Sequence, residues 1–86
     1  MNYDGPFANP TFVFRHVVGW MGEEEHLEAI FDQTRLARDF CSMQENEENR
    51  WTVVQVDVFE DLFIMRTAEL FHGGRTVDRV NLESIY

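Results

Sequence analysis

The longest stretch of the chain with a single hydrophobic period covers residues 22–44. Its apolar side chains recur at three- and four-residue intervals, as in a helix that buries one stripe. These apolar residues are Leu27, Ile30, Phe31, Ala37, Phe40 and Cys41. Gly22 suits the N-cap position, and the glutamates that follow suit the positive end of a helix dipole. The pattern therefore predicts one amphipathic helix over residues 22–44, with an acidic outer face.

Segments with a two-residue alternation lie on both sides of this predicted helix. Residues 11–19 and 50–58 are rich in β-branched and aromatic side chains, which favour strands. Alternation places every second side chain on the same face of a sheet. We therefore predict one strand before the helix and one strand after it.

Residues 62–71 allow two interpretations. As a helix, the segment would have Asp61 as its N-cap and would stop at Gly73. As a strand, it would lead into the hairpin signal Gly73-Gly74, after which residues 76–82 alternate weakly. The hairpin signal favours the strand, although the helix remains open at this point.

A chain of 86 residues is expected to form one domain. Residues 1–10 contain two prolines and a glycine, which predict an irregular N-terminal arm. Residues 11–86 predict a single α+β domain in which one helix packs on a sheet of three or four strands, in the order β-α-β-β-β. A crossover through the helix predicts that residues 11–19 and 50–58 are parallel neighbours.

One helix covers only one face of such a sheet, so the opposite face is expected to be exposed. A contiguous apolar patch on a small protein marks an interface. We therefore expect a homodimer or a protein partner at this sheet face. The apolar interface residues predicted in this way are Val13, Val17, Val53, Phe63, Met65 and Phe71.

The charge balance narrows the classes of partner. The net charge is −9, from sixteen acidic residues against seven basic ones, and all seven basic residues are arginines. This balance argues against direct binding to nucleic acid, which rewards clusters of Lys and Arg. It also argues against an anionic membrane surface. A basic protein partner fits the charge, and so does acidity that serves solubility alone.

A row of carboxylates on the predicted helix and the loop after it is the second candidate interface. Side chains three or four residues apart on a helix lie about 5–6 Å apart, so such a row can imitate a phosphate backbone. The acidic residues expected to bind a partner are Glu24, Glu25, Glu28, Asp32, Asp39, Glu47 and Glu48. In size, charge and absence of catalytic motifs, the chain resembles small acidic inhibitors of phages and mobile elements, including anti-restriction and anti-CRISPR proteins. The resemblance implies an inhibitor or regulator of a basic, nucleic-acid-binding protein.

Catalytic and metal-binding chemistry has little support in the sequence. Glu23 and His26 have the Glu-x-x-His spacing of di-iron bundles, but that motif occurs once and a di-iron site needs it twice. Cys41 lies on the apolar stripe and is expected to be a buried core residue. We therefore expect a non-enzymatic protein with no cofactor and no metal.

Two further expectations complete the sequence reading. No apolar run approaches the ~18 residues of a membrane span, which predicts a cytoplasmic protein of the host or producing cell. The alternative function is a homodimeric module that binds a small molecule or a metal. Its pocket would lie between helix and sheet, lined by His16 and phenylalanines.

Overall fold

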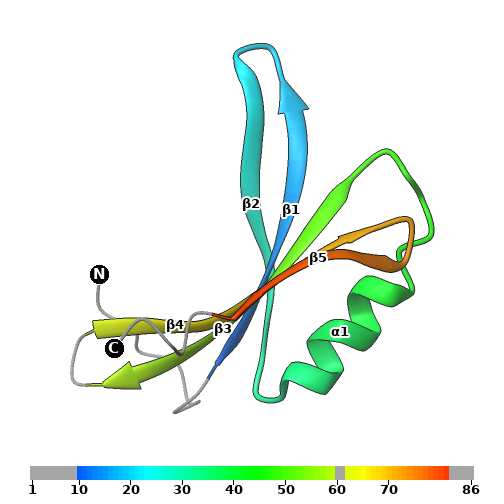
Figure 1. Cartoon of the computed structure of the whole chain (residues 1–86). Coiled ribbons are helices and arrows are strands. Elements are labelled where there is room, and N and C mark those ends of the chain that lie inside the picture. The colour runs from blue at the N-terminus through cyan, green and yellow to red at the C-terminus, as the bar shows by residue number, and fades with distance from the viewer. Residues whose placement is uncertain (1–9, 60–61, 82–86) are drawn as a thin grey trace.

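The described residues form a five-stranded antiparallel sheet and one helix (Figure 1). The computed structural model describes residues 10–59 and 62–81, with the backbone alone at positions 59 and 63. The predicted arm of residues 1–10 therefore lies outside the described residues except for Pro10. The strands run in the spatial order β2-β1-β3-β4-β5. The elements are β1 (Thr11–Gly19), β2 (Gly22–Phe31), α1 (Thr34–Ser42), β3 (Arg50–Phe59), β4 (Leu62–His72) and β5 (Arg75–Asn81).

The prediction of one helix over residues 22–44 is wrong in its first half. Residues 22–31 form β2, and the helix α1 begins only at Thr34. Gly22 does not cap a helix; it closes a hairpin with a φ of 120°, a value that glycine adopts easily. Apolar residues fall on both faces of β2 near its end, with Phe31 packed against the core and Ile30 exposed. Their spacing therefore imitated a helical stripe.

The strand predictions are confirmed, although the element order and the strand direction change. Residues 62–71 belong to β4, and Gly73-Gly74 forms a hairpin in which both glycines have positive φ, 62° and 79°. The order is β-β-α-β-β-β rather than β-α-β-β-β, and the sheet has five strands rather than three or four. Because β2 reverses the chain before α1, β1 and β3 are antiparallel rather than parallel.

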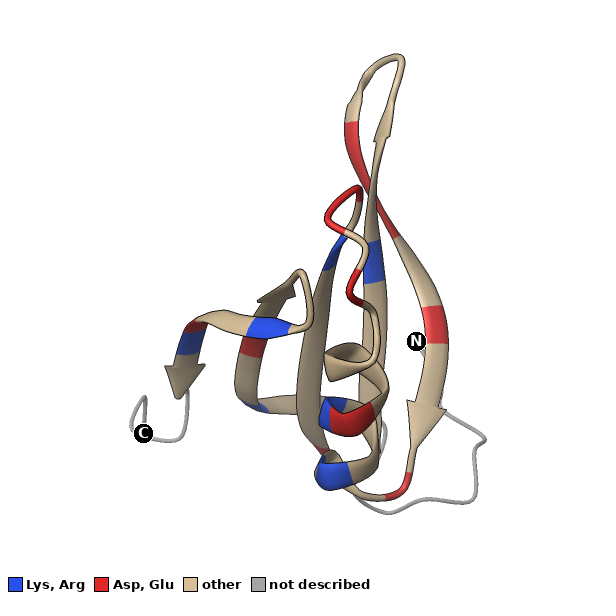
Figure 2. Cartoon of the chain, turned by 90° about the vertical axis from the view of Figure 1, so that its right-hand side faces the viewer, with Lys and Arg blue, Asp and Glu red and all other residues tan. Residues whose placement is uncertain are grey.

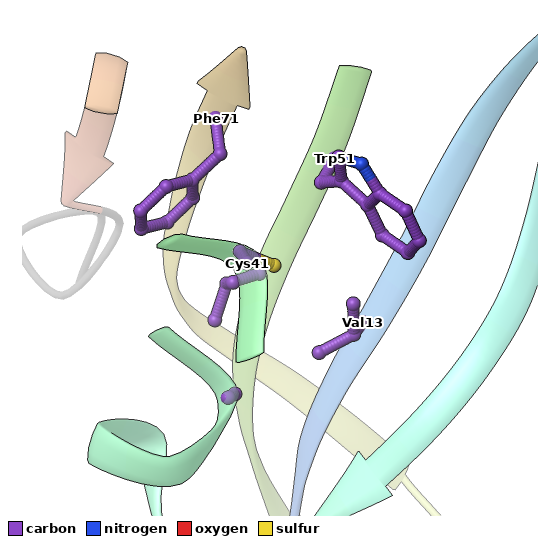
Figure 3. Packing of buried hydrophobic residues seen from close by; sticks show 6 residues of the cluster. Val13, Cys41, Trp51 and Phe71 are labelled. Carbon is purple, nitrogen blue, oxygen red and sulfur yellow. The ribbon is translucent and has the colours of Figure 1, made fainter. Parts of the chain in front are cut away.

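The hydrophobic core lies between α1 and the face of the sheet that α1 covers (Figure 3). Ala37 and Cys41 point from the helix toward the sheet and are fully buried. Rings from four elements, α1, β2, β3 and β4, pack beside them. Phe40 meets Trp51 edge to face at 5.5 Å between ring centroids. The buried cluster consists of Val13, Ala37, Cys41, Trp51, Val53 and Phe71.

This core corrects part of the predicted interface. Val13, Val53 and Phe71 were expected on the uncovered face, but they are buried under α1. Alternation shows which residues share a face, but it does not show which face a helix covers. The predicted helix began twelve residues too early, so its docking position could not be inferred.

An ion pair also ties α1 to the sheet. Glu69 lies on the covered face with its side chain 7% exposed. Arg38 Nε donates to Glu69 Oε1 at 2.8 Å, and Thr76 Oγ1 donates to Glu69 Oε2 at 2.7 Å. The carboxylate therefore joins α1, β4 and β5 at one point.

Cys41 is buried in the core, as the sequence predicted. Burial, and secondarily the nearby charge of Glu69, raises the pKa of its thiol to about 12. The thiolate is the reactive form of cysteine, so this residue fills space in the core and is not poised as a nucleophile.

Candidate functional site

The β1–β2 hairpin projects beyond the rest of the sheet (Figure 1). Pairing between β1 and β3 ends at His16 and Arg50, whereas pairing between β1 and β2 continues to Gly19 and Gly22. The end of this hairpin is therefore a two-stranded ribbon, with no third strand paired to β1 on its other side. Residues 17–24 form this projecting ribbon.

The seven acidic residues predicted to bind a partner do not share one helix face. Three lie on β2, one in the β2–α1 connection, one on α1 and two in the connection between α1 and β3. All seven are exposed. In the same order, they are Glu24, Glu25, Glu28, Asp32, Asp39, Glu47 and Glu48.

The fold brings part of this acidic set together in a way that the sequence did not predict. Glu23 of β2 and Glu47 and Glu48 of the α1–β3 connection line one open hollow of about 400 Å³. An adjoining hollow of about 320 Å³ is lined by Glu23 and Glu25. Figure 2 shows these red segments of β2 and of the α1–β3 connection toward the same end of the molecule. We call Glu23, Glu25, Glu47 and Glu48 the acidic end of the molecule.

Two histidines organise the acidic end. His16 Nδ1 lies 3.0 Å from Glu23 Oε1 and 3.8 Å from Glu25 Oε1, and its Nε2 hydrogen-bonds Thr52 Oγ1. His72 Nε2 donates to the backbone carbonyl of Glu47 at 2.8 Å. The first histidine holds the base of the hairpin, and the second holds the acidic connection against β4.

The remaining predicted acidic residues are partly compensated by arginines. Glu28 pairs with Arg15 at 2.8 Å, and Asp39 lies 4.0 Å from Arg35. Within residues 10–59 and 62–81, no ion pair involves Glu47 or Glu48. Glu47 and Glu48 therefore keep their charge without an ion pair among the described residues, although Arg50 lines the same hollow.

The uncovered face of the sheet is apolar, but with other residues than those predicted. Phe12 and Val54 pair directly, and they are chain neighbours of the buried Val13 and Val53, so they face away from α1. Of the predicted interface residues, Val17 is half-buried and Met65 is 55% exposed. The side chain at position 63 lies outside the described residues.

The pocket of the alternative function is not where it was expected. His16 shares the uncovered side of the sheet with Thr52, while the space between α1 and the sheet holds the core. In the described part of the chain, no group of three or more His, Cys, Asp or Glu side chains is placed to hold a metal ion. A small-molecule site would therefore have to use the open hollows beside His16.

Sequence reasoning missed Arg50, His72 and the tip of the hairpin. Arg50 and His72 line the same hollow as Glu48, although they come from β3 and β4. Their meeting depends on strand pairing over more than twenty residues, which no local pattern reveals. The tip carried a visible signal, because Gly19 and Gly22 bracket Trp20 and Met21.

Comparison with known proteins assigns this chain to no family. The chain matches no protein-family model, no curated protein and no solved structure. Within the described residues, α1 is the single helix, and it is too short and too polar to cross a membrane. The functional argument therefore rests on the residues themselves.

Proposed function

We propose that this protein is a small, non-enzymatic binding module that docks its acidic end on a basic protein. The sharpest form of the proposal is an inhibitor or regulator of a nucleic-acid-binding protein, as in phage anti-restriction and anti-CRISPR proteins. Such a partner already carries a surface that attracts phosphates. The proposal places this encounter in the cytoplasm of the host or producing cell.

One observation supports the proposal more than any other. Two acidic segments separated by more than twenty residues in the chain, Glu23–Glu25 and Glu47–Glu48, line one end of the molecule. Like charges placed side by side repel each other and lower stability. Their convergence, which His16 and Arg50 offset only in part, therefore supports binding of an outside basic partner. An acidic surface that serves only solubility would not require them to meet.

A matched pair of triple variants tests this proposal. The first variant, Glu25→Gln/Glu47→Gln/Glu48→Gln, removes three carboxylates from the acidic end. The second variant, Asp32→Asn/Asp39→Asn/Asp78→Asn, removes three carboxylates that do not line the two acidic hollows. Asp32 follows the opposite end of β2, about 30 Å from the hairpin tip at 3.3 Å per residue. Both variants have the same net charge.

The readout is capture of partners from host-cell lysate at low and high salt, followed by mass spectrometry. We expect the wild type and the second variant to retain the same basic nucleic-acid-binding protein at low salt. Screening weakens charge contacts, so this protein should be released at high salt and by added DNA or RNA. The proposal fails if the first variant retains that protein as well as the second variant does.

A second candidate function is binding of a small molecule in the hollow beside His16. The observation that favours it is the convergence of His16, Glu23 and Arg50 around about 320 Å³, a volume in the range of small-ligand pockets. A ligand that binds only the folded protein raises its melting temperature. A thermal-shift screen of small metabolites tests this candidate, and a His16→Ala variant should lose any shift that the wild type shows.

A further inference from the structure

The tip of the β1–β2 hairpin carries the most exposed large apolar side chains of the described residues. Trp20 is 94% exposed, Val18 is 83% exposed and Met21 is 80% exposed. All three lie on the projecting ribbon, where no third strand pairs with β1. They are thus presented away from the body of the molecule (Figure 1).

Turn formation does not explain this choice of residues. Gly19 and Gly22 pair with each other, so Trp20 and Met21 form a two-residue hairpin loop. Such loops favour Asn, Asp and Gly, which adopt the required backbone conformations and are polar or small. Trp and Met contribute nothing to this geometry. They also expose apolar surface to water, which is unfavourable in the absence of a partner.

The charges beside the tip restrict what the tip can bind. Glu23 and Glu24 follow Gly22 at the end of the loop, and the side chain of each is at least half exposed. An anionic membrane would repel this end. A second copy would bring another acidic hairpin, and a net charge of −9, against the first. A protein pocket with an apolar floor and a basic rim complements both the tip and the charges beside it.

We infer that Trp20 and Met21 form an anchor that inserts into an apolar pocket of a protein partner, while the acidic end contacts a basic rim around that pocket. The inference rests on the proposed function and specifies how the same partner is held. Trp is one of the residue types enriched among interface hot spots, where a few side chains dominate affinity. The hairpin presents it at the end of a ribbon tied down at its base by the Glu23–His16 contact.

The two parts of this interface make separable kinetic predictions. Rim charges act mainly on the association rate and its salt dependence, whereas buried anchors act mainly on the dissociation rate. Trp20→Ala should therefore raise the dissociation rate about 30-fold or more, with an unchanged salt dependence of association. Its thermal melting should match the wild type, because Trp20 is almost fully exposed.

The test places a photo-crosslinking residue at the tip and at a matched control position. Trp20→p-benzoylphenylalanine keeps a large apolar side chain at the tip. Met43→p-benzoylphenylalanine places the same group at the C-terminus of α1, where Met43 is 77% exposed but lies off the hairpin. Both proteins are irradiated in host-cell lysate and with phosphatidylcholine vesicles. Crosslinked peptides are then sequenced by mass spectrometry.

We expect position 20, but not position 43, to crosslink to one protein, at a peptide of apolar residues flanked by Lys or Arg. The anchor is refuted if position 20 gives no crosslink, gives the same crosslinks as position 43, or reacts with vesicles or with a second copy of this chain. The anchor alone is refuted if Trp20→Ala leaves dissociation unchanged while charge removal still slows association. If removal of the acidic-end charges leaves the association rate unchanged, the proposed function itself fails.

Discussion

Removal of Arg38 tests the attachment of α1 to the sheet. In the wild type, its guanidinium donates to both oxygens of Glu69, at 2.8 Å and 3.4 Å. In Arg38→Ala, the Glu69 carboxylate would stay buried, with its side chain 7% exposed. Among the described residues, the Thr76 hydroxyl would still donate a hydrogen bond to it. Removing one partner of a buried ion pair is costly because the other charge stays buried.

The size of the effect follows from the burial of the two partners. A hydrogen bond to a charged group contributes about 1.5–3 kcal/mol. Because the Arg38 side chain is half exposed, solvent screening lowers the contribution of this hydrogen bond toward the lower end of that range. The buried carboxylate left behind adds to the cost, so we expect a loss of about 2–3 kcal/mol. In a domain of this size, that loss lowers the melting temperature by about 10–20 °C.

The assay is urea unfolding followed by circular dichroism, with Arg35→Ala as the matched control. Arg35 lies on the same helix, its side chain is 73% exposed, and it is 4.0 Å from Asp39. The control should cost less than about 0.5 kcal/mol. The double variant Arg38→Ala/Glu69→Gln should be more stable than Arg38→Ala alone, because it removes the uncompensated buried charge. Equal effects of Arg38→Ala and Arg35→Ala would refute this reasoning.

Three further predictions concern the core and the turns. The pKa of Cys41 is raised from 9.0 to about 12 in the fold, so the thiol of the unfolded chain ionises first. The free energy of unfolding should therefore fall as pH rises from 9 toward 12. A Cys41→Ala variant should lose that part of the pH dependence. Val53→Ala, at a site 1% exposed, should cost about 2 kcal/mol in denaturant unfolding, against less than about 0.5 kcal/mol for the exposed Val80→Ala. Gly74→Ala should lower the melting temperature clearly, because a Cβ there would lie 2.8 Å from the Ser42 carbonyl oxygen at a φ of 79°.

The strands that formed as predicted are those whose local signal agrees with their tertiary setting. Residues 50–58 alternate β-branched side chains, and Gly73-Gly74 supplies the positive φ values of a tight hairpin. Both signals act within a few residues of the chain. They are therefore visible without knowledge of the rest of the fold. Together with the helical period that includes residues 34–42, they were sufficient to predict an α+β domain.

The strand β2 could not be predicted because its local signal points the other way. Glu is depleted in strands and tolerated in helices, and residues 23–25 are three glutamates in a row. What holds β2 as a strand is its pairing with β1, across which His16 contacts Glu23 and Arg15 pairs with Glu28. Cross-strand contacts of this kind depend on register, which the hydrophobic period alone does not supply.

The acidic binding site stays a prediction, and the structure shows only how its residues are placed. Glu25, Glu47 and Glu48 line two adjoining hollows at one end of the fold. Asp32 and Asp39, assigned to the same row, lie on other elements because the long helix that would have aligned them does not exist. The exposed tip at Trp20 was missed, because the predicted helix placed it in an ordinary turn.

The association rate with the captured basic partner, measured by stopped flow over a range of salt concentrations, tests the central claim most directly. We predict that Glu25→Gln/Glu47→Gln/Glu48→Gln slows association about tenfold at low salt and flattens its salt dependence. The matched variant Asp32→Asn/Asp39→Asn/Asp78→Asn should stay close to the wild type. Equal slowing by both triple variants would show that net charge alone governs the encounter, and would contradict a docking surface at the acidic end.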